Sequence, residues 1–563
     1  STTAFLILDL NRIDSLKLTD NELINKYNLI KKGDVIYANS FIKLEDVSQK
    51  AKLSERGVLI GSIKGNFITC LIPVNIIDSL TKDTNIKYIQ IGEKVKQTMD
   101  NARIAANVNQ VHSGTLLPQS YYGDGVVVGI IDEGFDYTHP NFYNSTGSSG
   151  YRIKRVWEQD ATIGVPPIGY TYGRELSTQA AILAAQRDEI NESHGTHVAG
   201  IAGGAGGGAS TSYTGVAPKS DLVFVSTNMT DPGVLEGIEY IQNYAASVGK
   251  PSVVNLSLGK HVGPHDGTSL FDQLCDSLLV GKGRVLVGSA GNEGSDNLYL
   301  EKTFTTIDTT LYSFVSFPNS SLGTNGITWI DTWGDVGDNF YIGVYVYNTS
   351  TNAFEDATPF LYNGAFTGTY SHTLYDNDFL SPDACVVDIS TGIDPLNNKP
   401  RASIYIDHTA QDDNYRFAFV EIKAFSTSTK MWSTNSIFSN NGYSYPAQSG
   451  SSNSTVGELG GTGKNMISVG AFTSKNSWTS FSSNPQSAPF YSALGALAPF
   501  SSKGPTADGR IKPDIAAPGN VLASSVSRFD ANYSSTSPKT VSGVTNGTNT
   551  WWYGMMQGTS MSA

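Results

Sequence analysis

The sequence predicts an α/β protein built on a doubly wound, mostly parallel sheet, with a small α+β domain before it and an all-β domain inserted into it. Two observations carry this prediction. From Gly123 onwards, nearly continuous apolar strands alternate with amphipathic helices, which is typical of a parallel sheet covered on both faces. After Gly294 the helices stop, and short alternating strands rich in Tyr, Phe, Thr and Val follow as far as Gln448.

Length, composition and charge exclude several classes of protein. At about 150 residues per domain, 563 residues suggest three or four domains, and 39% hydrophobic with 16% charged residues argues against a disordered or fibrous chain. A net charge of −13 disfavours nucleic acid or an anionic membrane as the main partner. The longest apolar runs fall short of the roughly 18 residues that a spanning helix needs, so we expect a soluble protein. Three widely spaced cysteines, Cys70, Cys275 and Cys385, predict separate thiols.

The first of four predicted segments, residues 1–95, is the α+β domain. One helix should lie between its first two strands and a second at Val74–Lys82, and the expected strands are Val35–Ala38, Val58–Ile63, Phe67–Ile72 and Tyr88–Ile91. The polar run Lys94–Asn107 has no strand pattern and is predicted as a linker. The apolar start, Ser1–Leu10, lacks a basic segment and a cleavage site, so we expect that any export signal has already been removed.

The α/β domain is predicted in two parts, residues 96–296 and 449–563, separated by a β-sandwich or jelly roll over residues 297–448. Asp231 is the expected N-cap of one helix, with Pro232 at the first helical position, and a further helix is expected at Ser269–Val280. The expected parallel strands are Val126–Ile131, Leu222–Val225, Ser252–Leu256, Arg284–Gly288 and Met466–Phe472.

Three segments carry candidate chemistry. Asp132 follows a predicted strand at its carboxyl end, where ligand sites of open α/β sheets lie. His194 stands at the entrance of a helix of small residues, HGTHVAGIA, and Ser560 in GTSMSA is expected in the first turn of a helix. A serine becomes nucleophilic when an imidazole takes its proton and a buried carboxylate orients that imidazole. Asp132, His194 and Ser560 supply this set.

Two further residues have competing interpretations. An oxyanion needs a preorganised donor, and Asn292 in SAGNEG, after the strand Arg284–Gly288, is the candidate; an ordinary turn is the alternative. His197 lies three residues after His194, but the glutamate of an HExxH motif is absent and no third ligand is evident. Helix packing is therefore favoured for His197 over a metal site.

These segments resemble the motifs of the subtilase family of subtilisin-like serine proteases. The matching strings, in the family's order, are IIDEGFDYTHP, HGTHVAGIAG, GVAPKSDL, VVNLSLG, SAGNEG, FSSKGPTADGRIKPDIAAPG and GTSMSA. The chain order Asp, His, Ser is that of subtilisin. The resemblance implies a serine endopeptidase that works through an acyl-enzyme and needs no cofactor for its chemistry.

The family's roles carry over by position. Asp132 would orient His194, His194 would act as general base and acid, Ser560 as nucleophile and Asn292 as oxyanion donor. The resemblance also implies that substrate backbone pairs with Ser257, Leu258 and Gly259, and that Ser289, Ala290 and Gly291 form a wall of the specificity pocket. Affinity would then come partly from strand addition.

The resemblance extends, on weaker motifs, to the first segment, which is similar to the ferredoxin-like propeptides of subtilases. Such a domain assists folding and blocks the cleft, so we expect a zymogen that cleaves itself within Gly92–Arg103. In its placement, the insertion resembles the jelly-roll insertions of clostridial spore-germination subtilases. Only three residues follow Ser560, where the family continues into a buried helix, so we expect an incomplete or cleaved chain.

The expected partners are a peptide or protein substrate and the chain's own propeptide, in a bacterial, extracytoplasmic setting: secreted, cell-surface or periplasmic. Subtilases often bind structural calcium; Asp376-Asn377-Asp378 is one acidic cluster, for which a solvated loop is favoured, and no ligands are assigned. Two other functions stay open. One is a latent or inactive scaffold of subtilase shape. The other is an adhesion module in which Trp329, Trp333 and Tyr345 of the insertion bind a glycan or protein, although core packing explains these aromatics equally well.

Overall fold

The structure is a computed structural model that describes residues 24, 29–91, 100–144, 149–188, 190–207, 213–364, 368–377, 384–440, 445–489 and 492–563. The chain separates into two compact units, Ser1–Gln97 and Thr98–Ala563, which are described one at a time. None of the helices in the described ranges has the length and apolar character that crossing a membrane requires.

In residues 29–91, the first unit is an antiparallel sheet with two α-helices. Its strand order is β1-β2-β4-β3, and β5 also pairs with β2. The two helices and the sheet share one apolar core that includes Leu53, Ile77 and Leu80. The predicted elements are all present, and one further strand, β1 (Ile30–Lys32), was not predicted. The predicted ones are β2 (Val35–Leu44), α4 (Ala51–Glu55), β3 (Leu59–Lys64), β4 (Phe67–Pro73), α5 (Ile77–Thr81) and β5 (Ile86–Ile91).

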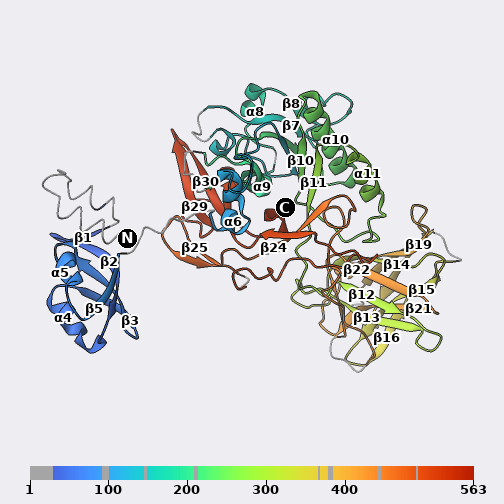
Figure 1. Cartoon of the computed structure of the whole chain (residues 1–563). Helices are drawn as coiled ribbons and strands as arrows, with labels where there is room; N and C mark the ends of the chain where they lie inside the picture. Colours follow the sequence, from blue (N-terminus) through green and yellow to red (C-terminus); the bar gives the residue numbers. More distant parts are fainter. Residues whose placement is uncertain are drawn as a thin grey trace. The chain divides into compact units, whose positions relative to one another are not determined.

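The second unit is organised around an eight-stranded sheet with the order β27-β24-β11-β10-β6-β9-β7-β8 (Figure 1). Every pairing is parallel except that of the edge strand β8 with β7. The strands, in chain order, are β6 (Val127–Asp132), β7 (Ile153–Glu158), β8 (Arg174–Leu176), β9 (Asp221–Ser226), β10 (Ser252–Leu256), β11 (Arg284–Ser289), β24 (Ile467–Phe472) and β27 (Ile515–Pro518). The predicted strands of the parallel sheet are confirmed.

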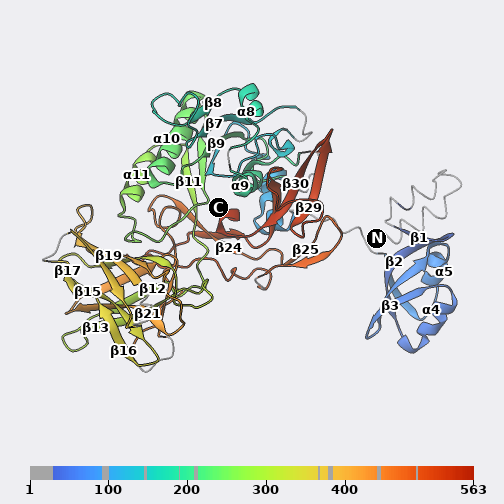
Figure 2. The same cartoon turned by 180° about the vertical axis from the view of Figure 1, so that it is seen from behind.

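Helices cover both faces of this sheet, as the view from behind also shows (Figure 2). In β6, Val127 and Ile131 pack with α10 (Asp231–Ser247) and α11 (Leu270–Leu278). The alternate residues, Val128 and Ile130, pack with α9 (His194–Gly203) on the other face. Because successive side chains of a strand point to opposite faces, a continuously apolar strand is what a sheet covered on both sides requires.

Two local predictions need correction. The division between the two units falls inside the predicted linker Lys94–Asn107, but this segment also contains α6 (Asp100–Ala105), and α7 (Val108–Ser113) follows it; α6 is short and has no strong apolar period. The N-cap of α10 is Thr230, not Asp231: the Thr230 hydroxyl accepts the Gly233 N–H at 3.2 Å, and Asp231 is the first helical residue. Both residue types cap helices well, so composition alone did not separate them.

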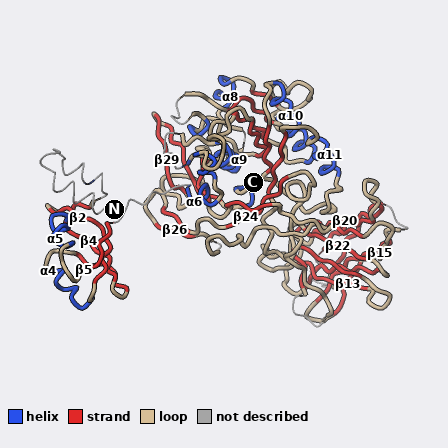
Figure 3. The backbone as a smooth tube through the Cα atoms, in the orientation of Figure 1, coloured by secondary structure: helices blue, strands red, loops and turns tan. Residues whose placement is uncertain are grey.

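The inserted segment forms two antiparallel sheets that share one apolar core, so it is a β-sandwich (Figure 3). One sheet has the order β12-β22-β14-β20-β19-β18 and the other β16-β15-β21-β13-β23, with β17 beside β15. Its strands are β12 (Tyr299–Thr303), β13 (Thr310–Ser316), β14 (Ile327–Gly334), β15 (Phe340–Asn348), β16 (Ala353–Ala357), β17 (Leu361–Tyr362), β18 (Gly368–Tyr375), β19 (Ala384–Ile393), β20 (Pro400–Asp407), β21 (Arg416–Ala424), β22 (Ser428–Ser433) and β23 (Ile437–Ser439). A jelly-roll path for these strands stays a prediction.

The chain enters and leaves the sandwich at one point. Tyr299 and Ser451 exchange two backbone hydrogen bonds, of 3.2 and 2.6 Å, and β11 pairs in parallel with β24 although the whole insertion lies between them. All three cysteines are buried free thiols, as predicted.

Several further elements of the second unit were not predicted, most of them near the end of the chain. The chief one is a three-stranded antiparallel sheet, β28-β30-β29, whose strand β28 packs on α9. These elements are α8 (Gln179–Ala185), β25 (Ser477–Thr479), β26 (Pro485–Ser487), β28 (Leu522–Val526), β29 (Thr540–Asn546) and β30 (Asn549–Met556).

Candidate active site

Asp132 and His194 form the centre of the site. Asp132 is the last residue of β6 and is completely buried. Its Oδ1 lies 2.7 Å from Nδ1 of His194 and also accepts the backbone N–H of Glu133 at 2.8 Å. A carboxylate at Nδ1 keeps the proton on that nitrogen, which leaves Nε2 of the imidazole as the basic atom.

A glycine allows the helix to start so close to the strand. His194 is the first residue of α9, and the N–H of the next residue, Gly195, donates to the carbonyl of Glu133 at 2.7 Å. A Cβ atom at Gly195 would lie 2.7 Å from that same carbonyl oxygen, too close for any side chain. The motif HGTHVAG thus places the imidazole directly against the carboxyl end of β6.

The charge of Asp132 governs the basicity of the imidazole. Burial alone would lower the pKa of His194, but the charge and hydrogen bond of Asp132, with smaller contributions from Glu133 and Glu192, raise it above its ordinary value. The His194 side chain keeps 32% of its surface exposed, so a substrate can reach it.

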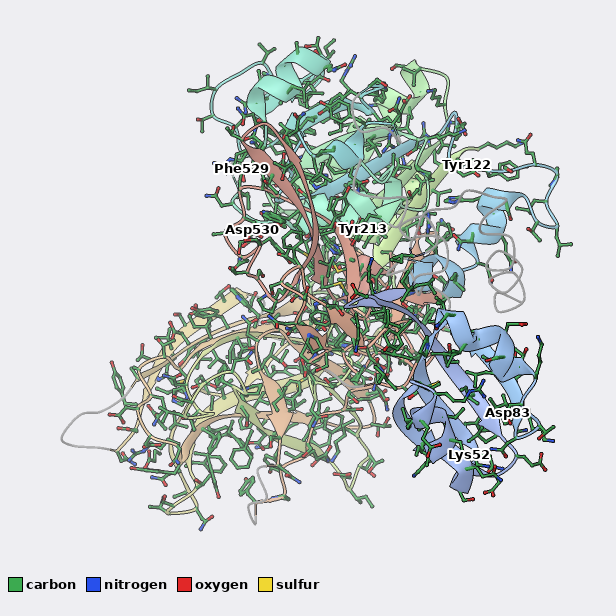
Figure 4. All side chains as sticks on the ribbon, turned by 90° about the vertical axis from the view of Figure 1, so that its left-hand side faces the viewer. Lys52, Asp83, Tyr122, Tyr213, Phe529 and Asp530 are labelled. Atoms are coloured by element: carbon green, nitrogen blue, oxygen red, sulfur yellow. The ribbon has the colours of Figure 1, made fainter. Side chains whose placement is uncertain are left out.

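The turn before His194 is fixed by a residue that sequence reasoning missed. The Ser193 hydroxyl donates to Oδ2 of Asp530 at 2.8 Å and accepts the N–H of Ser527 at 3.0 Å. Asp530 and its neighbour Phe529, both labelled in Figure 4, follow β28. Asp530 lies far from His194 in sequence, in a segment with no recognisable motif, so no local signal could have found it.

Ser560 lies in a single 3₁₀ turn, Thr559–Met561, which contacts α9. Its hydroxyl donates to the carbonyl of Ser257 at 3.3 Å, and the Ser257 hydroxyl donates to the carbonyl of Ser560 at 2.9 Å. Among the hydrogen bonds of the described residues, none joins Ser560 to His194, because the hydroxyl is turned toward Ser257. The structure thus brings the predicted base and nucleophile to neighbouring elements without a direct hydrogen bond between them.

Asn292 is exposed and follows β11. Its Oδ1 accepts the N–H of Thr559 at 2.8 Å and lies 3.1 Å from the Thr559 hydroxyl, which is also 3.1 Å from the carbonyl of Gly291. The backbone N–H of Thr559 can only donate, which identifies its partner atom as the amide oxygen. The other terminal atom of the amide is therefore Nδ2, a hydrogen-bond donor that points away from the Thr559 N–H.

The predicted substrate-binding segments follow two neighbouring parallel strands. Ser257, Leu258 and Gly259 come after β10, and Ser289, Ala290 and Gly291 end β11 or follow it. The Ser289 hydroxyl donates to the carbonyl of Leu258 at 3.2 Å, which joins the two segments. Ala290 accepts the N–H of Gly457 at 3.0 Å, and the Gly291 N–H donates to the Thr559 hydroxyl at 3.2 Å.

Glu293 is a second residue that sequence reasoning passed over, although it lies inside the motif SAGNEG. Its Oε2 accepts the N–H of Asn292 at 2.7 Å and the hydroxyl of Ser502 at 3.2 Å, and it lies 3.2 Å from Nε2 of His261. Burial acts in the opposite direction, but the hydrogen bond and charge of His261 hold the pKa of Glu293 below its ordinary value. An ionised carboxylate thus lies directly beside the predicted oxyanion donor.

One apolar cavity lies apart from the side chains of the candidate site. It has a volume of about 420 Å³ and apolar walls that include Val128, Ile201, Val253 and Met561. Asp132, His194 and Ser560 do not line it.

His197 is a packing residue, as predicted. It is completely buried, and its Nε2 lies 3.1 Å from the carbonyls of both Leu522 and Gly554. Burial lowers the pKa of His197 to about 3, so the ring is neutral. In the ranges that the structure describes, no three His, Cys, Asp or Glu side chains are grouped to hold a metal ion. Asp376 pairs with Arg416 at 3.3 Å, and Asp378 lies outside the described residues.

Comparison with known proteins agrees with this arrangement. The model of the subtilase family matches residues 123–563. The chain belongs to the subtilase family. Subtilisin E of Bacillus subtilis (strain 168) is 26% identical over 275 residues, which cover 47% of this chain and 60% of that protein. The subtilisin of Bacillus pumilus is 30% identical over 193 residues, 33% of this chain and 55% of that protein. This subtilase thus spans about 60% of the length of the first of these relatives.

Among solved structures, the CspB protease of Clostridium perfringens has a TM-score of 0.58 and covers 82% of this chain and 84% of that one. At 19% identity, this likeness concerns the fold.

Proposed function

We propose that this subtilase is a serine endopeptidase that cleaves peptide bonds through an acyl-enzyme. The observation that carries the proposal is the 2.7 Å hydrogen bond from a fully buried carboxylate, Asp132, to Nδ1 of His194, on a helix that contacts the turn of Ser560. This pair is the part of a serine-protease triad that makes an imidazole a base and stabilises its charged form.

The reaction then proceeds through this chain's own groups. The Ser560 hydroxyl rotates away from the Ser257 carbonyl toward Nε2 of His194, which takes its proton as Oγ attacks the substrate carbonyl carbon. Nδ2 of Asn292 donates to the oxyanion that forms. His194 next protonates the leaving amine, and a water molecule, activated by the same imidazole, releases the acid product and restores Ser560.

The substrate would bind as an added strand along Ser257, Leu258 and Gly259, with the side chain before the cleaved bond against Ser289, Ala290 and Gly291. Support comes from the places of these residues at the carboxyl ends of β10 and β11, beside the Ser560 turn. Main-chain pairing gives affinity for extended peptides, and the pocket selects among side chains.

We further propose that the first unit is a propeptide that assists folding and inhibits the enzyme until cleavage within Gly92–Arg103, of which residues 92–99 lie outside the described residues. The antiparallel sheet of this unit and the helices that share its apolar core support this role. We also propose that the partner is a peptide or protein substrate and that the protein works outside the cytoplasm. A structural calcium ion is part of the same proposal, and no ligands are assigned to it.

The structure gives little support to the alternative that aromatic residues of the insertion bind a glycan or protein. Trp333 is buried with its Nε1 donating to Asp331, and Tyr345 packs against Phe354 with ring centres 4.6 Å apart. Trp329 is 47% exposed and lies 4.8 Å from the Tyr405 ring, which leaves one of the three predicted aromatics on the surface.

Labelling with a fluorophosphonate probe, read by intact mass, tests the proposed function. The protein should gain one adduct, Ser560→Ala should gain none, and Ser562→Ala, a serine two residues later, should still be labelled. The same samples show whether the mass breaks within Gly92–Arg103. A folded wild type that neither reacts with the probe nor cleaves peptides would support the alternative of a latent scaffold.

A further inference from the structure

We propose that the inserted sandwich is a positioning element for the wall that carries Asn292, acting through three side chains stacked in series: Trp432, His265 and His261. The inference rests on the proposed function, because it concerns the same cleft. It gives the insertion a role in catalysis through contacts within this chain.

Trp432 is the end of the series that belongs to the sandwich. It lies on β22 and is completely buried. Its Nε1 donates to the carbonyl of Ser454, beyond the sandwich, at 2.8 Å. Its ring lies 4.2 Å from the ring of His265 with an angle of 9° between the planes, so the two rings are stacked. Trp432 therefore presents its indole to the α/β domain.

His265 is the middle of the series and is held tightly. Its backbone has a φ of +52°, a conformation that favours glycine, so surrounding contacts must hold it there. Its N–H donates to Oε1 of Glu458 at 2.6 Å, and its Nδ1 lies 2.9 Å from the carbonyl of Val456. Burial lowers the pKa of His265 to about 3, so the stacked ring is neutral.

His261 contacts both His265 and the wall that carries Asn292. Its ring is stacked on that of His265, with centres 5.6 Å apart and an angle of 9°. Its Nε2 lies 3.2 Å from Oε2 of Glu293, the atom that accepts the N–H of Asn292. A Cβ atom at Gly291 would lie 2.7 Å from this same oxygen, so the carboxylate packs directly on the wall. A shift of His261 would therefore act on Asn292 through a single atom, Oε2 of Glu293.

The sandwich also holds the loop that carries both histidines. Oδ2 of Asp331, on β14, accepts the N–H of Gly263 at 2.9 Å. Lys399 pairs with Asp266 at 2.6 Å, just after His265. His265 therefore lies between two anchors on the same sandwich, and the loop cannot move relative to the sandwich without breaking one of them.

Hydrogen exchange measures this coupling without requiring activity. In Trp432→Leu, amides of residues 289–294 should exchange about tenfold faster or more than in the wild type, while those of β6 stay protected. Trp432→Phe, which keeps an aromatic ring, should restore most of the protection. The matched control is Trp329→Leu, an exposed tryptophan of the same sandwich, which should leave the segment unchanged. Equal exchange in Trp432→Leu and Trp329→Leu would overturn the proposal.

A second pair of variants tests the series if Trp432→Leu does not fold. His261→Leu removes the contact with Glu293 and leaves the sandwich intact, so residues 289–294 should again exchange faster. His261→Gln keeps a donor and should exchange like the wild type. Identical exchange in the leucine and glutamine variants would contradict the coupling.

Kinetics separate this inference from the proposed function. Because an oxyanion donor acts mainly in the transition state, His261→Leu should lower kcat about tenfold and change KM less than about twofold. An unchanged kcat in an active enzyme would count against the coupling. If the wild type cleaves no peptide, the proposed function fails, and the exchange results still decide whether the sandwich controls the wall.

Discussion

One oxygen atom of Asn292 faces two donors of Thr559: Oδ1 accepts the Thr559 N–H at 2.8 Å and lies 3.1 Å from its hydroxyl. Thr559 immediately precedes the proposed nucleophile, Ser560. The turn that presents the nucleophile therefore also sets the orientation of the proposed oxyanion donor, so the two groups are placed relative to each other by short, direct contacts.

The role of Asn292 can be tested by truncation. Asn292→Ala should lower kcat by about 10²- to 10³-fold with little change in KM, the magnitude known for the oxyanion asparagine of subtilisin itself. Thr559→Val should lose part of this factor, because one donor to Oδ1 is removed, while Thr559→Ser keeps it. Steady-state kinetics on a chromogenic peptide measure all three, and an Asn292→Ala enzyme within about threefold of wild type would contradict the assignment.

The pH profile should report the Asp132–His194 pair. His194 must be neutral to accept a proton, so kcat/KM should rise with pH through its pKa, which the Asp132 charge raises above 6.5 despite burial. Asp132→Asn removes that charge, so the acid limb should move to lower pH and kcat should fall about 10⁴-fold. A profile whose acid limb does not move in Asp132→Asn would show that another group is the base.

Stability should depend on pH through Asp188, which is buried and accepts the Gly134 N–H at 2.9 Å and the Ser226 hydroxyl at 3.0 Å. Burial raises its pKa from 3.8 to about 6, so its stabilising contribution is complete below about pH 3.8 and is lost as pH rises to 6. Relative to wild type, Asp188→Asn should therefore gain about 2 kcal/mol in unfolding free energy between pH 4 and pH 7. Urea denaturation measures this, with the exposed Asp124→Asn as the control that should show no such gain.

Removal of Asp331, which anchors the sandwich to the α/β domain, should lower the free energy of unfolding. Asp331 is buried and accepts from Gly263, Trp333, Arg401 and Ser403, so Asp331→Ala leaves several donors without their acceptor. We expect a loss of about 3 kcal/mol or more in unfolding free energy. Asp388→Ala, on β19 of the same sheet and only partly buried, should cost less than about 1 kcal/mol. Similar losses in the two variants would show that Asp331 is no anchor.

Strong periodic patterns made much of the fold predictable. Residues such as Val127 and Val128 point to opposite faces of the sheet and are both buried, so a fully apolar strand indicated helices on both sides. Asp132 and His194 were found because their motifs are local and chemically specific. The motif GTSMSA placed Ser560 near them, but the direction of its hydroxyl depends on Ser257, some 300 residues earlier.

Contacts between distant segments were beyond the reach of pattern analysis. His261 lies outside the recognised motifs but contacts Glu293, which lies inside SAGNEG. Asp530 accepts a hydrogen bond from Ser193, which lies 337 residues earlier in the chain. The helix α6 is short and polar, so its formation depends on packing rather than on its own periodicity. Such features follow from tertiary structure, where the local sequence carries little information.

The backbone pairing of Tyr299 with Ser451 means that the sandwich could be deleted or exchanged as a unit. Because the two ends of the insertion meet, a short turn could join them in its place, and β11 and β24 could still lie side by side. Shuffling of such a segment between related genes would leave the hydrolytic framework unbroken while adding or deleting a whole module, as domain insertion in a loop generally permits. The same closure marks where a protein engineer could graft a different module beside the cleft.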